Sequence, residues 1–240
     1  MKHRCTLCLM LLCVAHVSAQ LDHRALYAAY LTGDVTSWGK VLQAVEQQPH
    51  PTLQTQIDAA NYAYGYIAFC LDKKRKQEAQ HCMAQLQQLV DTLERQHYDA
   101  CILSVYRSAL AAYGVSLNRI SAMVLASKAI KYAHIAMKQN PNNPMVMSLN
   151  GNIYFYRPTV LGGSKIKALH YYRHAVQLFE SANLTAYNWN YLAALLSMAQ
   201  ASEKIGDIET AKAVCLKILH IAPDFVYVRD TYYPKLLQKQ

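Results

Sequence analysis

The stretch that decides the fold is residues 148–176, which reads SLNGNIYFYRPTVLGGSKIKALHYYRHAV. Gly151 and Tyr154 stand three residues apart, and Ala168 and Ala175 recur at the spacing of one helix face. Alanine and glycine at such positions let two helix axes approach closely. The pattern therefore predicts two helices that pack against each other across a short connection.

Helical patterns extend in both directions from this stretch. Apolar residues recur at spacings of three and four almost everywhere, and no segment alternates as a strand would. Prolines stop helices, and here they lie between the periodic segments. We expect helices at 21–31, 35–47, 52–71, 76–96, 98–116, 119–139, 144–156, 164–180, 186–205 and 207–221, with a last short helix near 224–238.

Small residues at the spacing of one helix face also occur in two other runs, and a proline follows each run. The two runs are Ala129, Ala133, Ala136, Pro141 and Ala211, Cys215, Pro223. These runs resemble the tetratricopeptide repeat (TPR) family, in which paired helices touch through small residues and a proline closes the second helix. The resemblance covers 119–223 and is weaker over 52–118. It implies an all-α, TPR-like right-handed helical solenoid of about five antiparallel helix pairs with a C-terminal capping helix.

The repeat register also predicts which alanines lie at helix–helix contacts. These are Ala129, Ala136, Ala168, Ala175 and Ala211.

The connection over 156–165 is longer than the repeat needs and reads YRPTVLGGSK. A proline followed by Gly-Gly-Ser resembles the insertion of some exported bacterial TPR proteins, among them periplasmic T-components associated with TRAP transporters. We expect the two glycines to adopt unusual dihedral angles and Ser164 to cap the next helix. As an alternative, exposed amides there would hold a small anion with Arg157 and Lys165.

We expect the first 19 residues to be a targeting segment rather than part of the folded domain. Lys2 and Arg4 precede an apolar stretch, and Val-Ser-Ala ends it at Ala19, which is the order found in a secretory signal peptide. We expect cleavage after Ala19, a single TPR-like domain over 20–240, and a periplasmic or secreted location. A buried N-terminal helix is the alternative.

The composition excludes several classes of protein. The chain is 53% hydrophobic and 240 residues long, so it can bury a core and is not intrinsically disordered. No apolar run reaches the ~20 residues that span a bilayer. The net charge is +9, and its densest run, 73–76, falls between two helical patterns. We expect a solvated turn there rather than a nucleic-acid or membrane contact.

The sequence offers no catalytic or metal motif. His170 and His174 are spaced as two metal ligands on one helix, but no acidic residue completes a zinc motif, and we expect exposed histidines. No nucleophile, base and orienting group stand together, so we expect neither an enzyme nor a cofactor. Only Cys70 and Cys82 are placed to form a disulfide. We expect the cysteines beyond the signal to be buried thiols. They are Cys70, Cys82, Cys101 and Cys215.

Tyrosine is abundant, with 18 residues, and part of it is expected to line a concave binding face. The TPR resemblance places ligand contacts after the Gly-x-x-Tyr step, which gives a candidate site of Asn152, Phe155, Tyr156, Arg157 and Lys165. In the alternative, Phe155 and Tyr156 pack under the insertion and Arg157 is solvated. We expect an exported scaffold that binds a protein or peptide. The alternative is a ligand-binding accessory of a TRAP-like uptake system, with a small anion held in a closed pocket.

Overall fold

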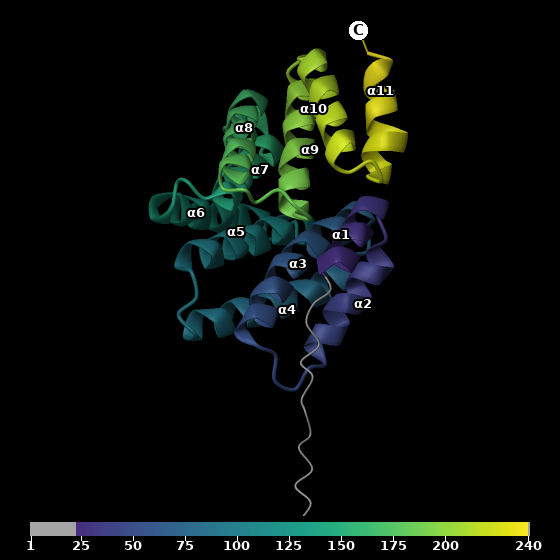
Figure 1. Cartoon of the computed structure of the whole chain (residues 1–240). Coiled ribbons are helices and arrows are strands. Elements are labelled where there is room, and N and C mark those ends of the chain that lie inside the picture. Colours follow the sequence, from purple (N-terminus) through teal and green to yellow (C-terminus); the bar gives the residue numbers. More distant parts are fainter. Residues whose placement is uncertain (1–22, 240) are drawn as a thin grey trace, which may run out of the picture.

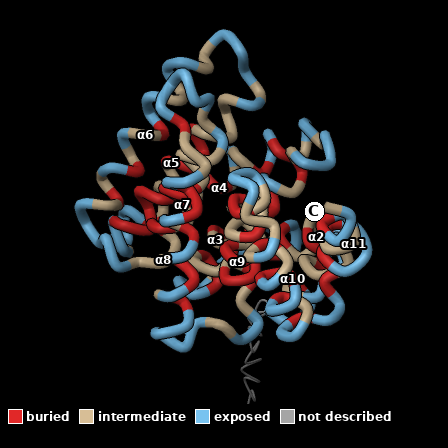
Figure 2. Tube along the Cα trace, turned by 90° about the horizontal axis from the view of Figure 1, so that it is seen from above, coloured by how far each residue is buried: buried red, intermediate tan, exposed pale blue. Residues whose placement is uncertain are grey.

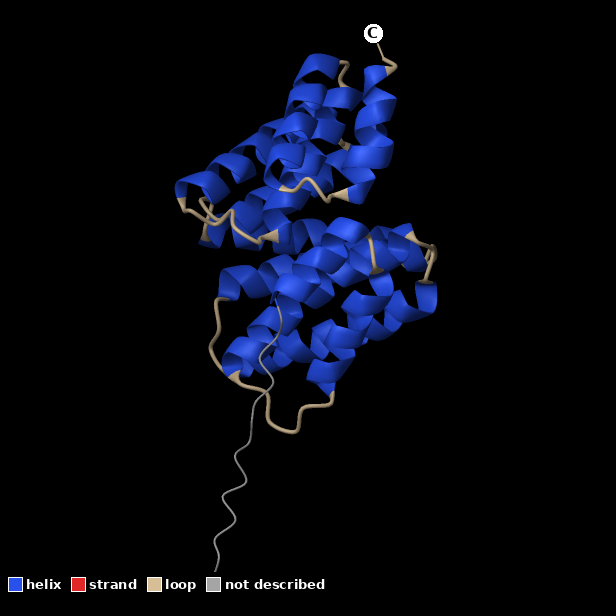
Figure 3. Cartoon of the chain, turned by 45° about the vertical axis from the view of Figure 1, so that its right-hand side comes forward, coloured by secondary structure: helices blue, strands red, loops and turns tan. Residues whose placement is uncertain are grey.

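The structure is a computed structural model that describes residues 23–239, and within that range every regular element is helical (Figures 1 and 3). The predicted signal peptide lies outside the described residues. The helices are α1 (His23–Thr32), α2 (Val35–Glu46), α3 (Leu53–Asp72), α4 (Lys76–Arg95), α5 (Ala100–Leu117), α6 (Ala122–Gln139), α7 (Pro144–Tyr156), α8 (Lys165–Ser181), α9 (Trp189–Lys204), α10 (Ile208–Ile221) and α11 (Tyr233–Leu237). A 3₁₀ turn, η1 (Thr159–Leu161), and a π-helical segment, η2 (Val228–Tyr232), complete them.

The predicted helix positions are confirmed to within three residues for the first ten helices. The two largest differences are helix starts that come three residues later than expected, and both have a local cause. The Asn118 side chain accepts hydrogen bonds from the amides of Ile120 and Ser121, which forms a turn and delays α6 to Ala122. Tyr187 has a positive φ, so α9 begins only after the cap at Asn188.

The C-terminal cap is less regular than predicted. A single helix was expected over 224–238, but η2 precedes α11. Pro234 explains the change, because it has no amide hydrogen to donate and its ring clashes with the carbonyl four residues earlier. The backbone therefore widens into a π-turn before α11.

Successive helices form antiparallel pairs stacked into an all-α helical solenoid (Figure 1). Buried residues gather along the helix middles and exposed ones at the turns (Figure 2). All five alanines predicted at helix contacts are buried, which confirms the register: Ala129, Ala136, Ala168, Ala175 and Ala211.

Among residues 23–239, one helix, α5, is long and apolar enough to cross a membrane by length and composition. Half of its 18 residues are buried in the protein, however, and both major core clusters contain side chains from it. Its only charged residue, Arg107, pairs with Glu94 at 2.7 Å. These contacts identify α5 as the core helix of the solenoid.

Two large core clusters follow one another along the solenoid, and a smaller third cluster joins α8 and α9. The N-terminal core holds side chains of α1–α5, and the C-terminal core holds side chains of α5–α10 and the capping segments. Trp189 of α9 is the exception, because its ring packs in the N-terminal core. The described cysteines divide equally: Cys70 and Cys82 are buried thiols of the first core, and Cys101 and Cys215 of the second.

Candidate functional site

A hollow of about 440 Å³ opens between helices that lie far apart in the sequence. Its walls come from the start of α1, the middle of α3, the α6–α7 turn, the end of α8, and the connection into α9. The lining residues are His23, Asn61, Tyr62, Asn143, Pro144, Met145, Phe179, Leu184, Ala186, Tyr187, Asn188, Trp189 and Asn190. We call this site the amide hollow, after two of the asparagines that line it.

Two side-chain amides that line the amide hollow are joined by a hydrogen bond. The Nδ2 of Asn190 donates to the Oδ1 of Asn61 at 3.0 Å, which joins α9 to α3 across 129 residues of sequence. Each amide has a second group, the Nδ2 of Asn61 and the Oδ1 of Asn190. Neither has a hydrogen-bond partner within residues 23–239. The hollow therefore offers one donor and one acceptor side by side.

Beside this pair, the ring of Trp189 forms a wall. A Cβ at Gly65 would lie 2.7 Å from that ring, so only glycine lets the indole reach the backbone of α3. Tyr30, Trp38 and Tyr64 surround the same indole with ring centroids 5.8–5.9 Å away. This packing fixes the backbone of α9 at the position where Asn190 follows.

The rim of the hollow carries a strained aromatic residue. Tyr187 has a φ of 49°, and the residue is 57% exposed. The other non-glycine residues with positive φ among those described, Lys74, His97 and Asn183, all follow helix ends, where that conformation is common. Tyr187 instead precedes a helix. The left-handed region costs an ordinary residue about 1–2 kcal/mol, and such strain concentrates at ligand sites.

Two contacts from α1 hold the Tyr187 ring at the rim. Tyr27 meets it edge-on at 5.6 Å, and the Arg24 guanidinium lies 5.3 Å from the ring centroid. At the start of α1, His23 shares a 2.8 Å hydrogen bond with the Tyr62 hydroxyl and lies 3.3 Å from Asp58. Burial raises the pKa of Asp58, and His23 opposes that shift.

The site predicted from the sequence lies at the other end of α7, and most of its side chains hold the insertion in place. The Oδ1 of Asn152 accepts a 2.8 Å hydrogen bond from the Tyr172 hydroxyl. The Lys165 ammonium donates to the carbonyl of Phe155 and lies 4.0 Å from the centroid of its ring. The ring of Phe155 also contacts that of Tyr156, which is 73% exposed.

Arg157 closes the insertion rather than pointing away from it. Its guanidinium donates to the carbonyl of Leu161 at 3.4 Å and lies 5.6 Å from the Tyr154 ring centroid. A Cβ at Gly163 would lie 1.9 Å from the Arg157 carbonyl oxygen, so a side chain cannot fit there. The structure brings the five predicted residues onto one segment, and their role in binding stays a prediction.

The backbone of the insertion corrects two expectations. Gly162 has the predicted unusual dihedral angle, with φ of 91°, and Ser164 caps α8 through the amide of Lys167. Gly163 does not have a positive φ, so for that residue the expectation was wrong. The amides of Gly162, Gly163 and Ser164, however, donate to the carbonyls of Thr159, Pro158 and Tyr154. The exposed amides expected for an anion are therefore turned inward, because the loop uses them to close on itself.

Sequence reasoning missed the amide hollow because its parts come from distant segments. Asn61 precedes Gly65 by one helical turn, and the chain reads Asn-Trp-Asn from Asn188 to Asn190. Taken separately, these asparagines are indistinguishable from residues that cap a helix or lie on a polar surface. Within residues 23–239, no cluster of His, Cys, Asp and Glu side chains is able to hold a metal ion.

Comparison with known proteins extends the description of the fold. No protein-family model matches the chain, and no curated protein matches it in sequence. Among solved structures, the HusA haemophore from Porphyromonas gingivalis is similar, with a TM-score of 0.58 and 16% identity. The match covers 76% of this chain and 92% of HusA. A thermophilic TPR protein from Thermus thermophilus is similar with a TM-score of 0.50 and 16% identity, over 91% of this chain and 99% of that one. At this identity, both likenesses concern the fold alone.

Proposed function

We propose that the chain is an exported helical-repeat scaffold that holds an extended peptide segment of a partner protein in the amide hollow. The observation that carries the proposal is the Asn61–Asn190 pair with its remaining donor and acceptor. A peptide group has one N–H and one C=O, and an extended segment has neither of them bonded internally. The two asparagine groups match that chemistry whatever the side chains of the peptide.

The rest of the hollow suits the side chains of such a segment. The rings of Trp189 and Tyr187 and the exposed Leu184 give apolar contact area beside the amides. Rigid aromatic rings of this kind dominate the energy of many interfaces. A volume of about 440 Å³ accommodates a few residues of peptide rather than a folded surface.

The test uses peptides selected from a random phage-displayed library against the mature chain, with affinity measured by fluorescence anisotropy. Asn61→Asp keeps the acceptor that receives the Asn190 amide but replaces the outward donor with an acceptor. We expect it to weaken binding about tenfold or more, because one hydrogen bond is lost and a carboxylate faces the peptide carbonyl.

Asn152→Asp is the matched control, because it likewise keeps the bond from Tyr172. We expect it to leave the affinity unchanged. If Asn152→Asp weakens binding and Asn61→Asp does not, the peptide site lies at the insertion. In that case Asn152→Ala combined with Arg157→Ala should abolish binding with no change in melting.

A second candidate ligand is a planar macrocycle such as haem. The observation that favours it is the set of rings around the hollow, together with the likeness of the fold to a haemophore. Haemin titration, followed by its visible absorption, separates the two ligands. Haem binding should depend on stacking, so Tyr187→Ala should weaken it at least tenfold while Asn61→Asp leaves it unchanged. Peptide binding requires Asn61.

Export is the remaining part of the proposal and rests on the order of residues at the N-terminus. N-terminal sequencing of material recovered outside the cytoplasm should begin at Gln20. Recovery of a chain that still begins at Met1 from the cytoplasm would contradict export.

A further inference from the structure

The positive charge of the chain is concentrated in one continuous segment. Residues 100–179 contain no Asp or Glu, although they carry nine of the 24 Lys and Arg residues. The remainder of the chain holds fifteen basic and fifteen acidic residues and is neutral. The segment corresponds to α5–α8 with the insertion, which is the middle of the solenoid.

Most cations of this segment are exposed and without an acidic partner. Arg107 pairs with Glu94, but six other side chains are exposed and lie beyond ion-pair distance of every carboxylate in residues 23–239. They are Arg119, Lys128, Lys131, Lys138, Lys167 and Arg173. Outside the segment the basic residues are matched in number by acidic ones, and Lys212, Lys217, Arg229 and Lys239 are among the cations with carboxylate partners.

Large aliphatic side chains stand out from the same segment. Ile120 is 98% exposed and Val160 is 92% exposed, so almost none of either side chain is covered by protein. Met123, Val124, Leu161 and Ile166 are exposed beside them. Single exposed apolar residues are ordinary, but a set of six at two adjacent turns marks an interaction surface.

These two turns lie on the same edge of the solenoid. The α5–α6 turn and the α7–α8 insertion each connect the two helices of a pair, and such turns stack on one edge. α5 and α7 pack against each other and run in the same direction, because each is antiparallel to α6, so their last turns lie on the same edge. The amide hollow is on the opposite edge, where the pairs are joined to one another.

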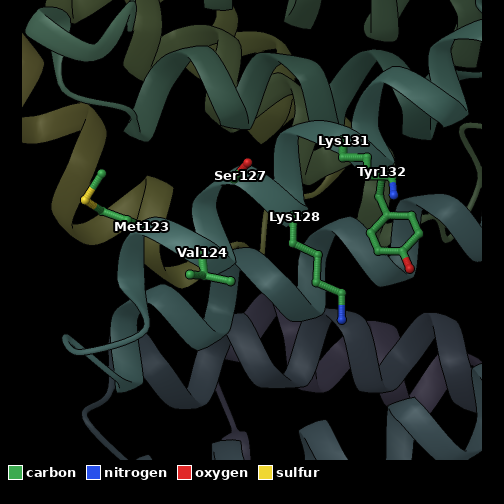
Figure 4. Close-up of a pocket in the computed structure, with 6 residues that line it drawn as sticks. All are labelled: Met123, Val124, Ser127, Lys128, Lys131 and Tyr132. Carbon is green, nitrogen blue, oxygen red and sulfur yellow. The ribbon is translucent and has the colours of Figure 1, made fainter.

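Figure 4 shows how the outer face of α6 combines the two kinds of side chain. A shallow hollow of about 590 Å³ has Met123 and Val124 at one end and Lys128, Lys131 and Tyr132 at the other. The Lys128 ammonium lies 6.0 Å from the centroid of the Tyr132 ring. Apolar contact and positive charge are thus within one helical face.

We propose that this edge docks the protein onto a membrane surface that contains anionic phospholipid. The six aliphatic side chains enter the boundary between headgroups and acyl chains. Arg119, Lys128, Lys131 and Lys167 are the cations nearest to these two turns, and they lie at the level of the phosphates. We call this surface the docking edge. Docking in this orientation leaves the amide hollow facing away from the membrane and open to its ligand.

The aliphatic side chains favour a membrane over a nucleic acid. Cations alone attract any polyanion, and a phosphate backbone gains nothing from Ile120 or Val160. A bilayer removes those side chains from water, which contributes about 25 cal/mol per Å² of apolar surface buried.

The test is sedimentation of the mature chain with phosphatidylcholine vesicles, made with and without phosphatidylglycerol. We expect binding to the vesicles that contain phosphatidylglycerol and little binding to the others, with added salt weakening it. Lys128→Gln with Lys131→Gln should reduce partitioning about thirtyfold, since each cation near an anionic surface contributes about fivefold. Ile120→Ser with Val160→Ser should reduce it at least tenfold.

The matched control is Lys40→Gln with Leu53→Ser, which removes one exposed cation and one exposed aliphatic side chain outside the segment. We expect it to bind as the unaltered chain does. Loss of binding in the lysine variant but not in the aliphatic variant would overturn the proposal and identify a polyanion site. Equal binding to both kinds of vesicle would also overturn it, because the charge would then play no part.

Discussion

The two ends of the solenoid differ in how far clustered aromatic rings take part in helix packing. In the C-terminal pairs, helices meet through alanine and glycine, as where Tyr172 lies so close to Gly151 that an added Cβ would be 2.4 Å from its ring. In the N-terminal pairs, Trp38 packs among Tyr30, Tyr62 and Phe69. Small residues fix a repeated distance, whereas large rings fill a space that occurs once.

Trp189 connects the two kinds of packing. It belongs to α9, in the alanine-rich part, but its ring lies in the aromatic core beside Trp38. The comparison therefore predicts that the two ends respond differently to the same class of substitution, and that Trp189 is where they depend on each other.

Removing the Trp189 ring should have the largest effect. Trp189→Ala should lower the free energy of unfolding by about 3–5 kcal/mol, measured by urea denaturation, because it leaves a cavity between Tyr30, Trp38 and Tyr64. Trp189→Phe is the control and should cost less, since it keeps a ring and removes an indole N–H that has no partner. A loss below about 1 kcal/mol would mean that the two cores do not meet through this residue.

The four buried thiols report which end loosens in that variant. Burial raises the pKa of Cys82 and Cys215 to about 12 and that of Cys101 to about 11, and it also raises the pKa of Cys70. An unfolded thiol ionises near about pH 8.5, so at mildly alkaline pH only an opened segment reacts with a thiol reagent.

In Trp189→Ala we expect Cys70 and Cys82 to react up to about a hundredfold faster, while Cys101 and Cys215 change less. Mass spectrometry of the labelled peptides gives each rate. The raised pKa values also determine how folding stability changes with pH. The stability that each protonated thiol contributes is complete below about pH 8.5, and it is lost as the pH rises toward the pKa of the folded state. Equal acceleration of all four thiols would show a single cooperative core.

The alanine-rich end should be sensitive to added volume instead. Ala168 is fully buried, so Ala168→Leu should cost about 1–3 kcal/mol by overpacking, measured from the melting curve. Ala213→Leu lies on the exposed face of α10 and should change stability by less than about 0.5 kcal/mol. The same loss in both variants would mean that the small-residue register does not determine the packing.

The difference between the ends also explains how much the sequence could predict. Contacts between adjacent helices leave a periodic trace, so the alanine positions, the helix bounds and the Ser164 cap could be predicted from spacing alone. The contact between Trp189 and Gly65 joins residues 124 positions apart and leaves no periodic trace. The Asn61–Asn190 pair depends on that contact, so the amide hollow could not be predicted either.

The predicted site shows the same limit at short range. The register placed Asn152 and Arg157 correctly near the end of a first helix, but it did not show what those side chains would contact. The Tyr172 hydroxyl donates a hydrogen bond to the side-chain carbonyl of Asn152, because Gly151 leaves room for the Tyr172 ring. Arg157 donates to the backbone carbonyl of Leu161, because the insertion folds back. Hydrogen bonds of this kind depend on the loop path, and a repeat pattern does not contain it.

The smallest expected effect comes from two helical glycines, and it sharpens the comparison most directly. Gly65→Ala places a Cβ 2.7 Å from the rigid ring of Trp189, whereas Gly114→Ala places one 3.0 Å from the methyl end of Leu125, a flexible side chain. Alanine is favoured over glycine in a helix by about 1 kcal/mol, and both positions receive that gain. At Gly65 the steric cost of the contact with Trp189 should exceed this gain in helix propensity, so the melting temperature should fall. At Gly114 the leucine can rotate away, so stability is kept or rises slightly.

Thermal melts of the two variants test the direction of each change in stability. Adding Trp189→Phe to Gly65→Ala should relieve the clash, and this third melt tests whether the indole ring is its cause. If Gly65→Ala is stabilising on its own, then the indole does not rest on the α3 backbone, and Trp189 is not what joins the two ends.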